Sequence, residues 1–141
     1  MNYLIDANIF LRLIVKENEQ IHRECEDFFN FAREALTDDI YTTDLIIAEV
    51  SWVLSRYYSF EKKSIVKALD VLVIQDFIKK IADTPWEDAL SIYSKHNVKL
   101  IDASTAAIIH ELGPKNWAVV SYDKDFDKLS VKRLEPKDVL R

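Results

Sequence analysis

Apolar residues along the chain form short runs and longer segments with helical spacing. Five short runs are predicted to be strands, because they are apolar and are bounded by polar or turn residues. They cover residues 2–5, 40–43, 77–83, 118–122 and 131–135. Six longer segments are predicted to be helices, because their apolar residues recur on one face. They cover residues 9–16, 20–36, 44–58, 61–75, 84–97 and 102–112.

Two helix boundaries in the second half of the chain have clear signals. Thr84 is predicted to cap a helix, with Pro85 at the first helical position and Glu87 three residues after the cap. The last predicted helix ends at Gly113, which is followed by Pro114.

Strands and helices alternate along the whole chain, and no repeat or linker divides it. This order predicts an α/β fold with three layers, α/β/α, in which helices cover both faces of a mostly parallel sheet. A length of 141 residues suits one domain, so we expect a single domain over residues 1–141. Sheets of this kind bind ligands beyond the carboxyl ends of their strands. Candidate functional residues are therefore expected there.

Four acidic residues stand at or just past predicted strand ends. Asp6 follows the first strand and Asp123 follows the fourth, while Asp102 opens a helix rich in small residues. Glu49 lies one and a half turns into the helix that follows the second strand. Each aspartate also has a purely structural explanation, because aspartate commonly caps helices and forms turns.

Glu49 interrupts the almost entirely apolar segment TDLIIAEVSWVL. Ile46, Val50, Leu54 and Tyr57 belong to an apolar arc roughly 120° wide, and Glu49 lies about 40° outside it. A carboxylate at the border of a buried face needs a compensating cation or donor. Either water and the nearby Arg56 meet this need, or the glutamate has a functional role.

Taken together, the four acids favour a functional site. Several carboxylates on one edge of a sheet repel one another unless a divalent cation neutralises them. Mg²⁺ and Mn²⁺ prefer carboxylate oxygens, and such ions support phosphodiester hydrolysis. Two hydroxyl residues near strand ends, Thr43 and Ser121, are candidates for orienting a ligand carboxylate or a phosphate.

Composition removes several other function classes. Gly113 is the only glycine, which excludes glycine-rich phosphate loops. The three histidines are scattered, which argues against a zinc site. Cys25 is the only cysteine, and we expect a structural thiol there. The net charge of −5 argues against a broad basic surface for nucleic acid.

Four motifs in order resemble those of the PIN domain family, and most closely its VapC-type toxins. They are YLIDANIF, LIIAEVSWVL, LIDASTAAIIHELG and VVSYDKDF, and the resemblance covers nearly the whole chain. It implies a five-stranded parallel sheet and an endoribonuclease that cleaves RNA with the help of Mg²⁺ or Mn²⁺. Asp6 and Asp102 match the two principal metal-binding aspartates. Glu49 matches the glutamate of the second motif, and Asp123 matches the fourth and most variable acid.

The resemblance also assigns neighbouring polar residues. Asn8 matches a polar position two residues after the first aspartate, and Ser121 stands where the family usually has threonine. Asp125 belongs to the last motif, but we expect it to cap the turn while Phe126 packs in the core.

The resemblance further implies a homodimer and a small inhibitory antitoxin protein as partners, besides the RNA substrate. Arg12 and Arg56 are the preferred phosphate-binding bases, since each follows an acidic motif closely. Other candidate bases are Lys16, Lys62, Lys63, Lys79 and Lys80. No apolar run is long enough to span a membrane and the start of the chain does not resemble a signal peptide, so we expect a cytoplasmic protein.

Other functions are compatible with the same pattern. A PIN-fold nuclease that processes RNA or cleaves DNA without a toxin role is one, and a non-catalytic RNA-binding PIN protein is another. An aspartate-based phosphotransfer protein is a third, but Asp6 in the sequence DAN lacks the second aspartate of the phosphatase pattern.

Overall fold

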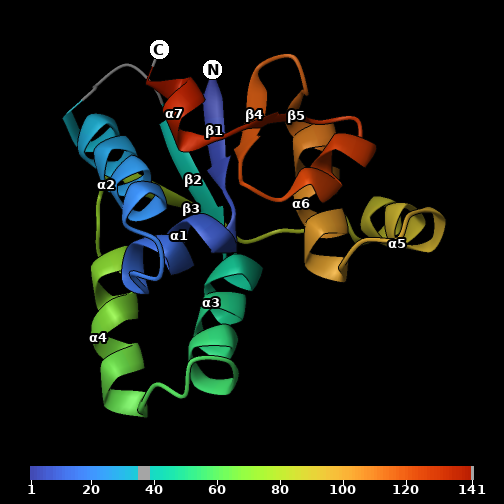
Figure 1. The fold of residues 1–141 in the computed structure, drawn as a ribbon. Coiled ribbons are helices and arrows are strands. Elements are labelled where there is room, and N and C mark those ends of the chain that lie inside the picture. Colours follow the sequence, from blue (N-terminus) through green and yellow to red (C-terminus); the bar gives the residue numbers. More distant parts are fainter. Residues whose placement is uncertain (35–38, 141) are drawn as a thin grey trace.

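The computed structural model describes residues 1–34 and 39–140. A five-stranded parallel sheet with strand order β3-β2-β1-β4-β5 lies at its centre (Figure 1). The strands are β1 (Asn2–Ile5), β2 (Asp39–Thr43), β3 (Ile78–Ile81), β4 (Trp117–Val120) and β5 (Lys132–Leu134). All five predicted strands are therefore confirmed, with ends that differ by no more than two residues.

Helices cover both faces of this sheet, which confirms the predicted three-layer α/β/α class. The helices are α1 (Ala7–Ile14), α2 (Glu19–Glu34), α3 (Asp44–Arg56), α4 (Lys62–Val73), α5 (Trp86–Lys95), α6 (Leu100–Leu112) and α7 (Pro136–Val139). A short 3-10 helix, η1 (Lys124–Lys128), precedes β5. The last two residues of the predicted helix 20–36 lie outside the described residues, and the short α7 and η1 were not predicted.

Alternation along the strands divides the apolar interior into two cores. Tyr3 and Ile5 of β1 face the core formed with α1, α2, α3 and α4, whereas Leu4 faces the core that contains α6. Val119 and Val120 of β4 divide between the two cores in the same way. This is the pattern of central strands that are covered on both faces.

Helix α6 is buried on nearly every side, because its middle residues are small. Ala103, Ala106 and Ala107 are fully buried, and Ser104 and Thr105 satisfy their hydroxyls by donating to the carbonyl of Ile101. The helix ends at Gly113, as predicted; its φ of 112° lies in the region that favours glycine.

Cys25 is buried in α2, and burial raises the pKa of its thiol to about 11. The thiol therefore stays protonated near neutral pH and has a structural role.

Two local predictions for helices were wrong. Pro85, not Thr84, occupies the N-cap position of α5, and no side chain caps that helix. Tyr57, expected to face the core, lies at the end of α3 and is 77% exposed; Trp52 on the same helix is 62% exposed. Helices α3 and α4 pack together and project from one end of the sheet, so part of their apolar surface has no sheet to cover it (Figure 1).

Candidate active site

The site begins where the two central strands end. Ile5 of β1 pairs with Val120 of β4, so the residues that follow them, Asp6 and Ser121, emerge side by side. The backbone N–H of Asp6 donates to the carbonyl of Val120 at 3.1 Å, which fixes this junction. β2 and β3 lie beyond β1 on one side of this junction, and β5 lies beyond β4 on the other. The order of the strands therefore reverses between β1 and β4, and such a point is the usual ligand site of an open α/β sheet.

Ser121 links three parts of the site through its hydroxyl. The buried hydroxyl donates to Oδ2 of Asp6 at 2.8 Å and accepts from Nδ2 of Asn8 and the backbone N–H of Asp123, both at 2.9 Å. Because both accepted bonds come from N–H groups, the hydroxyl hydrogen is left for Asp6. Oδ1 of Asn8 also accepts from the backbone N–H of Tyr122 at 3.3 Å. Ser121 and Asn8 therefore hold the Asp6 carboxylate in a defined orientation.

Thr43, the other hydroxyl residue considered from the sequence, has a local role. Its side chain accepts the backbone N–H of Ile46 at 3.1 Å and so caps α3.

Asp102 is buried in the first turn of α6. It is the third residue of that helix and not its cap, because α6 begins at Leu100 and Lys99 holds the N-cap position. Within the described residues, its Oδ2 is the one buried side-chain oxygen or nitrogen that lacks a hydrogen-bond partner. A buried carboxylate oxygen without a donor is unfavourable unless a cation meets it.

Asp123 and Asp125 lie beside Asp102. One carboxylate oxygen from each of the three residues lies within 4.8 Å of the others. The prediction that Asp125 caps the turn was wrong: Asp123 caps η1 by accepting the backbone N–H of Asp125 at 2.9 Å, and Asp125 accepts from Nζ of Lys128 at 3.1 Å. Phe126 is fully buried, as expected.

Glu49 is compensated by a cation that sequence reasoning missed. Nζ of Lys99 lies 3.3 Å from Oε1 of Glu49, whose side chain is only 18% exposed. Arg56 is exposed and forms no ion pair among the described residues, so the explanation through Arg56 was wrong. The one signal in the sequence was that Lys99 lies three residues before Asp102.

Burial and mutual repulsion raise the pKa values of Asp6 and Asp102. Burial, with a smaller contribution from the charge of Glu49, raises the pKa of Asp6 to about 6, against the opposing effect of the Ser121 hydrogen bond. Burial and the charge of Asp6 raise the pKa of Asp102 to about 7. Asp123 and Glu49 make smaller contributions to this rise in pKa, and Lys99 opposes it. Asp6, Glu49, Asp102, Asp123 and Asp125 thus form one interacting set, here named the acidic edge.

The two preferred phosphate-binding arginines are not joined to the acidic edge by any contact in the described part of the chain. Nη1 of Arg12 lies 3.4 Å from Oε2 of Glu17, and Arg56 is exposed at the end of α3. Two further bases named from the sequence also have other partners. Lys79 pairs with Asp39 at 2.8 Å, and Lys80 donates to the carbonyl of Val73.

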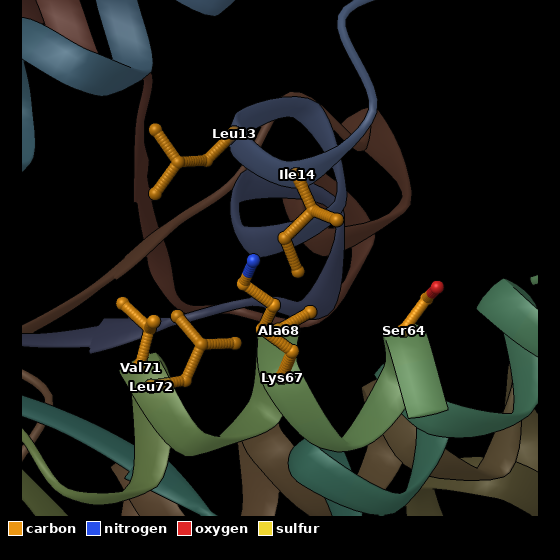
Figure 2. A pocket seen from close by; sticks show the side chains of 7 residues that line it. All are labelled: Leu13, Ile14, Ser64, Lys67, Ala68, Val71 and Leu72. Carbon is orange, nitrogen blue, oxygen red and sulfur yellow. The ribbon is translucent and has the colours of Figure 1, made fainter. Parts of the chain in front are cut away.

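A second concave surface lies elsewhere, between α1 and α4 (Figure 2). It is a largely apolar groove of about 360 Å³, here named the apolar groove. Its lining residues are Leu13, Ile14, Ser64, Lys67, Ala68, Val71 and Leu72. Figure 2 shows the apolar side chains of α4 directed toward those of α1.

The donor set of the acidic edge fits a hard divalent cation. The described donors are carboxylate and hydroxyl oxygens, with neither cysteine nor histidine among the three clustered residues. Mg²⁺ and Mn²⁺ take such oxygens, while Zn²⁺ sites favour nitrogen and sulfur. The unpartnered Oδ2 of Asp102 is the observation that most directly favours a cation there.

The fold and the site define a class: three-layer α/β proteins with an acidic site at the reversal point of a parallel sheet. Within that class, the family model of the PIN domain matches residues 3–132, and the chain belongs to the PIN domain family. No curated protein matches the sequence.

Solved structures with the same fold include one toxin and two VapBC proteins. VapC20 of Mycobacterium tuberculosis, a toxin that cleaves the sarcin–ricin loop, is 15% identical with a TM-score of 0.71 and covers 92% of this chain and 95% of its own. VapBC2 of Rickettsia felis, bound to a DNA fragment from its promoter, is 16% identical with a TM-score of 0.62. The match covers 96% of this chain and 98% of the VapBC2 chain. VapBC-1 of nontypeable Haemophilus influenzae is 14% identical with a TM-score of 0.63, covering 97% and 99%.

Proposed function

We propose that this protein is a metal-dependent endoribonuclease that hydrolyses RNA phosphodiester bonds at the acidic edge. The observation that carries the proposal is the buried Oδ2 of Asp102, which has no partner, on a residue whose carboxylate clusters with those of Asp123 and Asp125. A structural aspartate is satisfied by protein donors. This oxygen is instead placed to bind a cation, and membership of the PIN family is consistent with that role.

Each residue of the site has a proposed task. Asp6 and Asp102 are the principal ligands of one Mg²⁺ or Mn²⁺, and Asp123 binds directly or through water. Ser121 and Asn8 orient Asp6, because their hydrogen bonds leave the carboxylate one fixed position. When bound, the cation lowers the pKa of the attacking water and stabilises the leaving oxygen.

Glu49 is proposed to act on the site through its charge and through its bond to Lys99. Arg12 and Arg56 remain proposed contacts for flanking phosphates of the substrate. Both are basic side chains on the helices that follow the acidic motifs, and neither is buried. Contacts of this kind position an RNA strand without reading its sequence.

The proposed biological role is that of the toxin in a VapBC-type toxin–antitoxin pair. The similar structures include one toxin that cleaves an RNA loop and two toxin–antitoxin complexes, which supports this role over a general nuclease. We propose a cytoplasmic enzyme that forms a homodimer. No helix in the described part of the chain combines the length and apolarity needed to cross a membrane.

An antitoxin partner is proposed to place an apolar segment in the apolar groove. Val71 lines the groove and is 56% exposed, and exposed apolar surface of this kind marks contact sites in proteins. The test is co-expression of this chain with a short protein encoded beside it in the genome, if the genome carries one. Val71→Glu is expected to abolish co-purification. Val66→Glu is the control, since Val66 is 61% exposed on the same helix and outside the groove.

Cleavage of a structured RNA by wild type and Asp6→Asn, with Mn²⁺ or with chelator, tests the nuclease proposal. We expect cleavage only by wild type and only with the metal. Cleavage that survives both the substitution and the chelator would contradict the mechanism. Asp70→Asn is the control, because Asp70 is exposed on α4 and lies outside the acidic edge.

A further inference from the structure

Lys99 lies at the boundary between the acidic edge and solvent. Its backbone lies at the N-cap of α6, its Nζ lies 3.3 Å from Oε1 of Glu49, and its side chain is 63% exposed while that of Glu49 is 18% exposed. The anchoring carboxylate is therefore mostly inside the protein, and the ammonium stands at the rim. An ammonium has three N–H donors, of which the bond to Glu49 uses one.

The charge of Lys99 acts on the whole site and not only on Glu49. Among the strongest electrostatic influences on both Asp6 and Asp102, Lys99 is the cation, and all the other charged groups are carboxylates. An RNA phosphate that enters this site meets five acidic side chains, of which Asp125 is paired with Lys128. One divalent cation does not offset the other four, so a further positive charge at the rim is needed to make the approach of an anion favourable.

We propose that Lys99, held in place by Glu49, binds a non-bridging oxygen of the substrate phosphate and supplies the positive charge that a second metal ion provides in two-metal nucleases. This inference rests on the proposed nuclease function. Two-metal sites place their ions about 3.5–4 Å apart to clamp both sides of the phosphate. Here the closest carboxylate group comprises Asp102, Asp123 and Asp125, while Glu49 is engaged by the ammonium.

The arrangement divides the acids by task. Asp6, Asp102 and Asp123 remain for a single cation, and Glu49 becomes a positioning residue for Lys99. A purely structural ion pair is the competing explanation, since exposed pairs of lysine and glutamate are common on surfaces. The two explanations differ in RNA affinity and in its salt dependence, neither of which a purely structural pair would change.

RNA affinity is the first readout, measured in an Asp6→Asn background so that no substrate is consumed. Lys99→Met removes the charge and keeps the side-chain length, Lys99→Arg keeps the charge, and Lys95→Met is the control on exposed α5. We expect Lys99→Met to weaken binding of an RNA hairpin by about 10-fold and to reduce the salt-dependence slope by about 1. Lys99→Arg and Lys95→Met should bind as the background does.

The number of Mn²⁺ ions bound is the second readout, measured by titration of the otherwise wild-type protein. We expect one ion in wild type, and one ion bound more tightly in Lys99→Met because a neighbouring positive charge is lost. Unchanged RNA affinity and salt slope in Lys99→Met, or two Mn²⁺ ions in wild type, would overturn the inference while leaving the nuclease proposal intact. A wild type that neither binds Mn²⁺ nor cleaves RNA would overturn the proposed function itself.

Discussion

Proteins usually bury apolar side chains and expose charged ones, and two regions of this molecule do the opposite. The acidic edge buries charged groups, and the apolar groove exposes apolar groups. At the acidic edge, Asp6 and Asp102 are buried and one oxygen lacks a partner. At the apolar groove, Val71 and its neighbours expose apolar surface to solvent. Both arrangements cost free energy in the isolated chain. A cation would relieve the first cost and a protein segment would relieve the second.

The two regions are also built from different kinds of element, which suits them to different kinds of partner. The acidic edge is built on the ends of central strands and on the tightly packed α6, so its geometry is rigid. The groove is built on α4 and on the last residues of α1, Leu13 and Ile14. Catalytic sites need fixed atoms, whereas a protein contact tolerates adjustment of side chains.

The largest expected effect on RNA cleavage follows from removing the unpartnered charge. Asp102→Asn should reduce metal-dependent RNA cleavage by at least about 100-fold, or about 2.7 kcal/mol. It should also abolish stabilisation by Mn²⁺, because a ligand that binds only the folded state raises the unfolding temperature. Thermal unfolding with and without Mn²⁺ measures the second effect. A cleavage rate equal to that of the Asp70→Asn control would show that Asp102 is structural.

The next effect concerns pH in the metal-free protein. The pKa values of Asp6 and Asp102 are raised from 3.8 to about 6 and about 7, so the folded state holds more protons than the unfolded state in this range. The free energy of unfolding should therefore fall as the pH rises from about 4 to about 7, by on the order of 6 kcal/mol. Urea unfolding at several pH values measures it.

The double variant Asp6→Asn, Asp102→Asn is the control for this pH effect. It should remove most of the fall and be more stable than wild type above pH 7. A wild type whose stability rises with pH over the same range would contradict the raised pKa values.

A smaller effect is expected at the residue that orients Asp6. Ser121→Ala removes the donor to Asp6 and the acceptor for the N–H groups of Asn8 and Asp123. Loss of these buried bonds should lower the free energy of unfolding by about 1–3 kcal/mol and the cleavage rate by about 10-fold. Ser121→Thr retains the hydroxyl and should retain activity. Equal losses in both variants would show that packing, not the hydroxyl, is what matters.

The smallest expected effect lies at the apolar groove. Val71→Glu should change the free energy of unfolding by less than about 0.5 kcal/mol, because its side chain is exposed, and it should leave RNA cleavage unchanged. Only binding of the antitoxin should suffer. A loss of cleavage in this variant would show that the acidic edge and the apolar groove are coupled and do not act independently.

The parts of the site that the sequence could predict are those governed by strand ends. Asp6 and Ser121 follow short apolar runs, and parallel strands bring their carboxyl ends to one edge of the sheet. Asp102 was predicted as a site residue although its helix begins two residues earlier than expected, since an N-cap and a first-turn position leave similar signals. The order of strands and helices sufficed for the fold class.

Other features depend on contacts that local patterns do not encode. Lys99 and Glu49 are 50 residues apart in sequence, so their pairing appears only after the chain folds. Asp123 and Asp125 are both plausible caps of one turn, and the backbone of η1 decides between them. Tyr57 has the spacing of a core residue, but α3 projects beyond the sheet that would have covered it.

Calorimetric titration of Mn²⁺ into the wild-type protein and into Asp102→Asn tests the central claim most directly, namely that the acidic edge is a cation site. Wild type should bind Mn²⁺ with release of protons at pH 7, because ligation favours the ionised form of Asp6 and Asp102. Asp102→Asn should show no binding at the same concentrations. Equal Mn²⁺ binding by both proteins, or none by wild type, would contradict the claim.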